Sequence, residues 1–160
     1  YALAAPLWAL AGGSVLAVRL LSACFQGATV FLVWLGATRL LPGRPAVAFG
    51  AAAVAAFLPV QAQLGGAISN DALTHLLCVP LVFAAARWAE RGNTVREAAL
   101  LGVLFGAGLW TKLTVLQMAP LLALGAAVGA ARGRLSWRDA ALRTALLVAV
   151  GLAVASPWLA

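Results

Sequence analysis

The chain has 160 residues, of which 64% are hydrophobic and only 9% are charged. A water-soluble domain of this length needs more polar sequence to cover its core, so the composition indicates an integral membrane protein. The formal charge of +7 does not indicate a nucleic-acid partner, because the arginines lie in short turns between apolar stretches, as the positive-inside rule predicts for cytoplasmic loops.

The N-terminal third predicts two membrane spans. Residues 1–18 are apolar but contain Pro6 and two adjacent glycines, so a crossing and a juxtamembrane helix lying along the outer surface both remain open. The first clear span is residues 20–41, which ends at a Leu-Pro-Gly-Arg-Pro turn. The second is residues 46–64, and Pro59 near its far end is expected to kink it.

The remaining apolar stretches predict four further spans. Residues 72–88 follow an outer loop, and residues 140–158 form the last span. Residues 98–131 would form one helix of about 51 Å, which is too long for a single crossing. A break at Thr111-Lys112 divides this stretch into spans 95–111 and 113–131, in which two Gly-x-x-x-Gly pairs, at 102/106 and 125/129, predict close helix packing.

The expected fold class is therefore all-α, a polytopic transmembrane helical bundle with about six spans and an N-terminal interfacial helix. Residues 1–160 form a single transmembrane domain in this interpretation. Because the chain begins at Tyr1 and stops at the end of an apolar stretch, we expect it to be a fragment of a longer protein.

The basic residues divide into two groups. Nine arginines mark the predicted cytoplasmic ends: Arg39, Arg44, Arg87, Arg91, Arg96, Arg132, Arg134, Arg138 and Arg143. Arg19 and Lys112 fall on the opposite, extracytoplasmic side, as does Asp71. Two cations on that face would suit an anionic headgroup, with Arg19 and Lys112 as phosphate ligands.

Asp71 has two interpretations. It precedes a predicted helix, where acidic and amide side chains cap the first turn, and Asn70 beside it has the same property. It is also a carboxylate at the membrane surface, where a functional role is equally compatible. His75, four residues later, would lie on the same helical face and could orient Asp71, whereas a metal site lacks further ligands and is not expected. Cys24 and Cys78 are expected to be packing or lipid-facing residues.

An ordered series of short motifs resembles a known family. It comprises Arg19-Leu20-Leu21-Ser22, Arg39-Leu40-Leu41-Pro42, Phe57-Leu58-Pro59, Ser69-Asn70-Asp71-Ala72-Leu73 and Gly106-x-Gly108-Leu109-Trp110-Thr111-Lys112. This series is similar to GT-C glycosyltransferases that use polyprenyl-phosphate sugars, in particular bacterial relatives of protein O-mannosyltransferases and of the lipid A aminoarabinose transferase. Residues 1–10 resemble the juxtamembrane helix of the family's first outer loop.

The resemblance implies a GT-C-like fold and transfer of a sugar from a polyprenyl-phosphate donor to an acceptor on the extracytoplasmic face of a bacterial inner membrane. The acceptor is a protein, a lipid or a glycan, and no cofactor beyond the donor is implied. Arg19 and Lys112 match the donor-phosphate ligands, and Asn70 with Asp71 matches polar residues of the outer cavity. The catalytic residue, a general base, is expected upstream of Tyr1.

Two other functions stay open. A non-catalytic envelope protein would keep the fold without an acidic residue in the preceding outer loop. A transporter would place polar residues at the bilayer midplane and use broken helices in paired halves. The predicted spans have apolar midplanes, which makes transport the weaker hypothesis.

Overall fold

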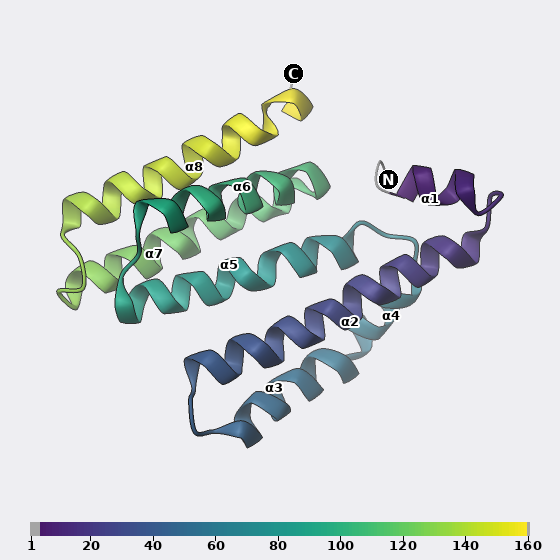
Figure 1. The fold of residues 1–160 in the computed structure, drawn as a ribbon, viewed down its shortest axis with the longest axis horizontal. Helices are drawn as coiled ribbons and strands as arrows, with labels where there is room; N and C mark the ends of the chain where they lie inside the picture. The colour runs from purple at the N-terminus through teal and green to yellow at the C-terminus, as the bar shows by residue number, and fades with distance from the viewer. Residues whose placement is uncertain (1–3, 160) are drawn as a thin grey trace. The chain divides into compact units, whose positions relative to one another are not determined.

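The computed structural model describes residues 4–159 (Figure 1). The described residues form α-helices, one 3-10 helix and turns, without a β-strand, which confirms the all-α fold class. Four helical segments are long and apolar enough to cross a membrane, and a bent pair of helices is a possible fifth. The helices form two compact units, Tyr1–Leu76 and Leu77–Ala160, which are described separately below.

Unit 1 begins with α1 (Ala4–Leu10) and α2 (Val15–Leu40). The two are separated by Gly12 and Gly13, whose φ angles of 60° and 83° favour glycine. Ser14 then caps α2, accepting a hydrogen bond from the Ala17 N–H. The expected helix of residues 1–18 is therefore divided, and its first three residues lie outside the described part. Arg19 consequently lies inside α2 rather than before it.

The predicted kink at Pro59 is a full break. α3 (Pro45–Phe57) and α4 (Pro59–Gly66) meet at a bend of 57°. Leu58 between them is extended, with φ −62° and ψ 121°, as expected of a residue that precedes proline. α4 packs on α2 through Gly65, where an added Cβ would lie 3.1 Å from Cβ of Gln26. The broken pair corresponds to the predicted span 46–64.

Helix α5 (Asp71–Arg91) starts in unit 1 and continues into unit 2. Unit 2 further contains α6 (Val95–Thr111), the 3-10 helix η1 (Leu113–Gln117), α7 (Met118–Ala131) and α8 (Trp137–Leu159). α6 coincides with the predicted span 95–111. Its 17 residues extend about 26 Å, slightly less than the roughly 30 Å hydrocarbon core.

Both glycine pairs of unit 2 bring helices into close contact. At Gly102 and Gly106 of α6, an added Cβ would lie 2.7 Å and 2.6 Å from backbone oxygens of α8. At Gly129 of α7, it would lie 2.5 Å from the carbonyl oxygen of Trp88 in α5, and Gly125 faces the Ala85 backbone in the same way. The packing predicted from these two motifs is confirmed.

The turn between α5 and α6 is fixed by polar contacts. Thr94 and Glu97 form a capping box: the Glu97 N–H donates to Thr94 Oγ1 at 3.2 Å, and the Thr94 N–H donates to Glu97 Oε2 at 2.9 Å. Glu97 also pairs with Arg87 of α5. Arg143 of α8 donates to the backbone and side-chain oxygens of buried Asn93. These bonds tie the loop to α6 and α8, and they tie α6 to α5.

Replacing Thr94 by Ala is expected to destabilise the protein by about 1 kcal/mol, because one N–H of the α6 first turn loses its acceptor. Thermal unfolding of the full-length protein in a fixed detergent measures this change. Thr38→Ala is the matched control, since the Thr38 hydroxyl is exposed and bonds only the Trp34 carbonyl of its own helix. Equal melting temperatures for the two variants would show that the cap is not stabilising.

Candidate functional site

The turn before α5 holds Asp71 through Ser69. The Ser69 hydroxyl donates to Asp71 Oδ2 at 2.9 Å and accepts from the Asp71 N–H at 3.1 Å. Asn70 starts the helix, because its carbonyl accepts both the Thr74 N–H and the Thr74 hydroxyl at 2.9 Å. Asp71 is the first residue of α5, where a carboxylate interacts favourably with the helix dipole. This geometry supports the capping interpretation of the turn and leaves the carboxylate partly exposed.

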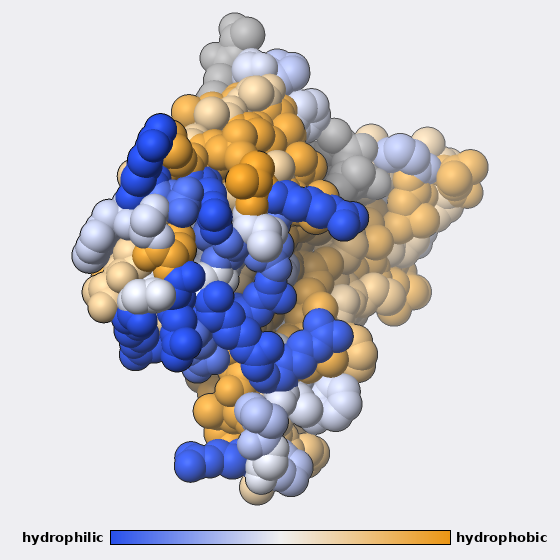
Figure 2. All heavy atoms as spheres, turned by 60° about the vertical axis from the view of Figure 1, so that its left-hand side comes forward, coloured by the Kyte–Doolittle hydropathy of each residue, from blue (hydrophilic) through white to orange (hydrophobic). Residues whose placement is uncertain are grey.

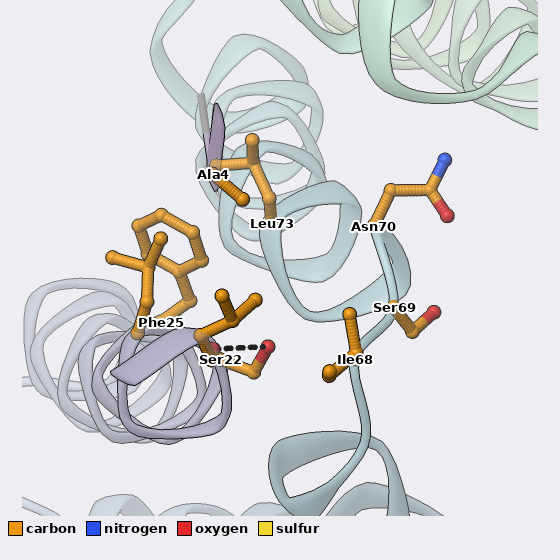
Figure 3. Close-up of a pocket in the computed structure, with 9 residues that line it drawn as sticks. Ala4, Ser22, Phe25, Ile68, Ser69, Asn70 and Leu73 are labelled. Carbon is orange, nitrogen blue, oxygen red and sulfur yellow. Dashed lines mark hydrogen bonds between the residues drawn. The ribbon is translucent and has the colours of Figure 1, made fainter. Parts of the chain in front are cut away.

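A small hollow in unit 1 joins this turn to α2. It is lined by Ala4, Val18, Leu21, Ser22, Phe25, Ile68, Ser69, Asn70 and Leu73. In Figure 3 the side chains of Ser69 and Asn70 point away from Phe25 and Leu73, so the walls are mainly apolar. Its volume of about 50 Å³ is far below the roughly 300–1,000 Å³ of ligand pockets. The hollow alone therefore accommodates neither a sugar nor a phosphate headgroup.

The hollow nevertheless brings together two of the predicted segments. Val18 and Asn70 line it from α2 and from the 68–70 loop, and each is next in sequence to a predicted site residue, Arg19 and Asp71. Arg19 is exposed in the second turn of α2. The part of α2 that carries Arg19 thus lies beside the turn that carries Asn70 and Asp71.

Lys112 lies at the predicted break in unit 2. α6 ends at Thr111, and Lys112 is extended, with φ −162° and ψ 132°. The Gly108 carbonyl accepts both the Lys112 N–H at 3.1 Å and the Thr111 hydroxyl at 2.7 Å, which closes the helix end. Lys112 itself is exposed. The backbone therefore presents this lysine at a helix vertex, as the length argument predicted.

His75 has a partner that the sequence did not suggest. Its Nδ1 lies 3.0 Å from Gln61 Oε1 in α4, so the bond spans 14 residues and links the short helix to α5. Since the amide oxygen only accepts, the bond requires a proton on Nδ1. Among the described residues, no group of three His, Cys, Asp or Glu side chains is placed to hold a metal ion.

One polar feature of α2 was missed. Ser22, Gln26 and Thr29 are buried at i, i+4, i+7 spacing, which places them on one face of the helix. Ser22 and Thr29 donate to carbonyls of their own helix, whereas neither polar atom of the Gln26 amide has a partner in the part of the chain that the structure describes. α2 therefore carries a buried polar face that the expectation of apolar midplanes did not include, and the spacing of these three residues was its signal.

The sequence model of the dolichyl-phosphate-mannose-protein mannosyltransferase family matches residues 1–160. The chain belongs to this family. It is accordingly an integral membrane protein of the GT-C glycosyltransferase type. No curated protein and no solved structure matches the chain.

Membership of the mannosyltransferase family suggests which roles the polar residues of the chain can have. In a glycosyltransferase, charged residues at the edge of the bilayer are candidates for contact with a lipid-linked substrate, in addition to their structural roles. The broken pair α3 and α4 and the buried polar face of α2, which would otherwise favour transport, then belong to a glycosyltransferase fold.

Proposed function

We propose that the protein transfers a sugar from a polyprenyl-phosphate donor to an acceptor on the extracytoplasmic face of the membrane. The observation that carries this proposal is the family match over the whole chain, whose description names a lipid-phosphate mannose donor and a protein acceptor. Mannose is therefore the first sugar to test. A bacterial inner membrane, with the arginine-rich loops on the cytoplasmic side, is the proposed location.

The proposed reaction is an inverting displacement. An acceptor hydroxyl oxygen attacks the anomeric carbon while the bond from that carbon to the phosphate oxygen breaks. The leaving polyprenyl phosphate takes the bonding electrons and gains negative charge, and the acceptor proton passes to the general base. That base is proposed to lie in an outer loop upstream of Tyr1.

Arg19 and Lys112 are each proposed as ligands of the donor phosphate. Fixed cations stabilise the charge that develops on the leaving phosphate, and their effect is large where water is scarce. Three features support this role: the resemblance of the segments around Arg19 and Lys112 to motifs of the family, the exposure of both residues, and the expected topology, which places both opposite the arginine-rich loops. Asn70 and Asp71 are proposed to contact the sugar or the acceptor from the turn beside Arg19.

The role of Asp71 is tested by Asp71→Asn, which removes the charge but keeps an oxygen that accepts a hydrogen bond from Ser69. If Asp71 contacts a substrate, sugar transfer by the full-length protein falls about 10-fold or more while the melting temperature stays within about 1 °C. If the carboxylate serves only the helix, the melting temperature falls and transfer per folded protein is unchanged. Ser69→Ala is the matched control, because it perturbs the same turn without removing the carboxylate.

The donor class is tested with the full-length protein reconstituted in liposomes. Polyprenyl-phosphate mannose and a soluble nucleotide mannose are supplied separately, and labelled sugar on the acceptor fraction is measured. We expect transfer from the lipid donor alone. Transfer from the nucleotide sugar alone would refute the lipid-phosphate donor, and the absence of any transfer would favour the non-catalytic alternative.

A further inference from the structure

Near the turn between α5 and α6 and the turn between α7 and α8, unit 2 has more arginines than are needed to bond its helices together. Residues 77–160 contain seven arginines and three acidic residues, so the arginines outnumber the acidic residues by four, and Lys112 adds a further positive charge. Three of the arginines have partners: Arg87 pairs with Glu97, Arg132 donates to the Ala89 carbonyl at 3.2 Å, and Arg143 bonds Asn93 and lies 3.8 Å from Asp139. These three hold the helices together.

The other four arginines do not connect the helices. The side chains of Arg91, Arg96, Arg134 and Arg138 are exposed and make no hydrogen bond or ion pair within residues 4–159. Arg91 is the last residue of α5, and Arg96 is the second residue of α6. Arg134 lies in the turn between α7 and α8, and Arg138 is the second residue of α8. Figure 2, in which the left-hand end of Figure 1 comes forward, shows strongly hydrophilic residues gathered on this face.

A close backbone contact holds the two turns together. An added Cβ at Gly92 would lie 3.1 Å from the Arg134 carbonyl oxygen and 3.3 Å from Leu135 Cδ2, and Gly92 has a φ of 71°, which favours glycine. Arg91 directly precedes Gly92, so the backbones that carry Arg91 and Arg134 are neighbours. Two positively charged residues are thus carried on neighbouring stretches of backbone, and an anion bound to both side chains would offset the repulsion between their charges.

The residues and helices around Arg91 and Arg134 indicate which kind of anion would bind there. α5, α8 and the segment Leu113–Ala131, which comprises η1 and α7, are each long and apolar enough to cross a membrane. Each has an end near these turns. Trp137, the first residue of α8, is 63% exposed beside Arg138, and exposed tryptophans are typical of the headgroup level of a bilayer. Basic residues on adjoining turns at the headgroup level are a known arrangement for phospholipid headgroups. We propose that Arg91 and Arg134, supported by Arg96 and Arg138, bind the phosphate of an anionic phospholipid.

This lipid site is independent of the donor site, since it involves none of Arg19, Asn70, Asp71 and Lys112. A guanidinium group offers paired N–H donors that match two phosphate oxygens, so arginine binds the group more specifically than its charge alone requires. Binding is expected to weaken as salt rises, because both partners are at the surface. Its role would be to hold the two turns, and the helices they connect, at the membrane surface.

The test measures retention of phosphatidylglycerol against phosphatidylcholine by the purified full-length protein, using native mass spectrometry. The wild-type protein is expected to retain phosphatidylglycerol preferentially. Arg91→Gln/Arg134→Gln should lower that affinity about 30-fold, since each arginine near the surface contributes about 1 kcal/mol. Arg39→Gln/Arg44→Gln is the matched control: it removes the same charge from an exposed turn of unit 1 and should leave the retention unchanged.

The results of this experiment distinguish a local phospholipid site from diffuse charge attraction and from a site for a free anion. Equal losses in the two double variants would show diffuse charge attraction and overturn a local site, as would no loss in either. Displacement of phosphatidylglycerol by millimolar inorganic phosphate would also overturn the proposal, because the site would then recognise a free anion. Melting temperatures in phosphatidylcholine should be equal for all variants, and Arg91→Lys/Arg134→Lys, which keeps the charge, should retain part of the affinity.

Discussion

Replacing Lys112 by Ala is expected to lower kcat for sugar transfer from polyprenyl-phosphate mannose by about 10²–10³-fold, as for the loss of other groups that stabilise a developing anion. The change removes the side-chain charge. Lys112 closes α6 through its backbone N–H, which alanine also provides, so the end of α6 should be preserved. Steady-state kinetics of the full-length protein, with folded protein quantified, measure the effect.

Arg44→Ala is the control for this experiment. It removes one exposed positive charge from the turn between α2 and α3, among the loops predicted to be cytoplasmic, and should leave kcat unchanged. Lys112→Arg should retain much of the activity, because it preserves the cation. If Lys112→Ala and Arg44→Ala have the same kcat as the wild type, Lys112 is not a phosphate ligand.

The second large effect concerns helix packing. Gly106→Val is expected to destabilise the protein by about 3 kcal/mol or more, because the new side chain overpacks a backbone contact. At this position even a Cβ would lie 2.6 Å from the Gly151 carbonyl oxygen and 2.6 Å from Val154 Cβ. α6 and α8 would have to separate, and the indole Nε1–H of Trp110 would lose its 2.8 Å hydrogen bond to the Val154 carbonyl oxygen.

Thermal unfolding of the full-length protein measures this loss, with Gly27→Val and Gly50→Val as controls. Both glycines lie in helices and would meet nothing within 4 Å, so the same substitution should have only a small effect there. A melting temperature for Gly106→Val equal to those of the controls would contradict the close contact of α6 and α8.

The features that the sequence predicted follow from local rules. Lys112 was placed at a vertex because one helix of about 51 Å exceeds the membrane thickness. Pro59 predicted a kink because its ring excludes the preceding residue from helical geometry. The glycine pairs at 102/106 and 125/129 predicted close packing because only glycine lets backbones approach that far. Each of these predictions depends only on residues that are close together in the sequence.

The features that the sequence did not predict depend on tertiary packing or on a helix cap with a weak sequence signal. Arg19 was placed before the first span because Gly12 and Gly13 did not mark the exact helix start, which the Ser14 cap determines. His75 was assigned to Asp71 by helical spacing, whereas the 57° break after Phe57 brings Gln61 to the ring. α4 also packs on α2 at Gly65 and Gln26, a contact between distant residues that hydrophobic periodicity does not predict.

We propose that Arg19 and Lys112 are each ligands of the phosphate of the lipid-linked donor. The most direct test is the binding of sugar-free polyprenyl phosphate to the full-length protein in phosphatidylcholine nanodiscs, where anionic phospholipid is absent. We expect Arg19→Gln/Lys112→Gln to weaken binding at least 10-fold relative to the wild type, while Arg91→Gln/Arg134→Gln binds normally. Equal affinity of the wild type and Arg19→Gln/Lys112→Gln would contradict the claim.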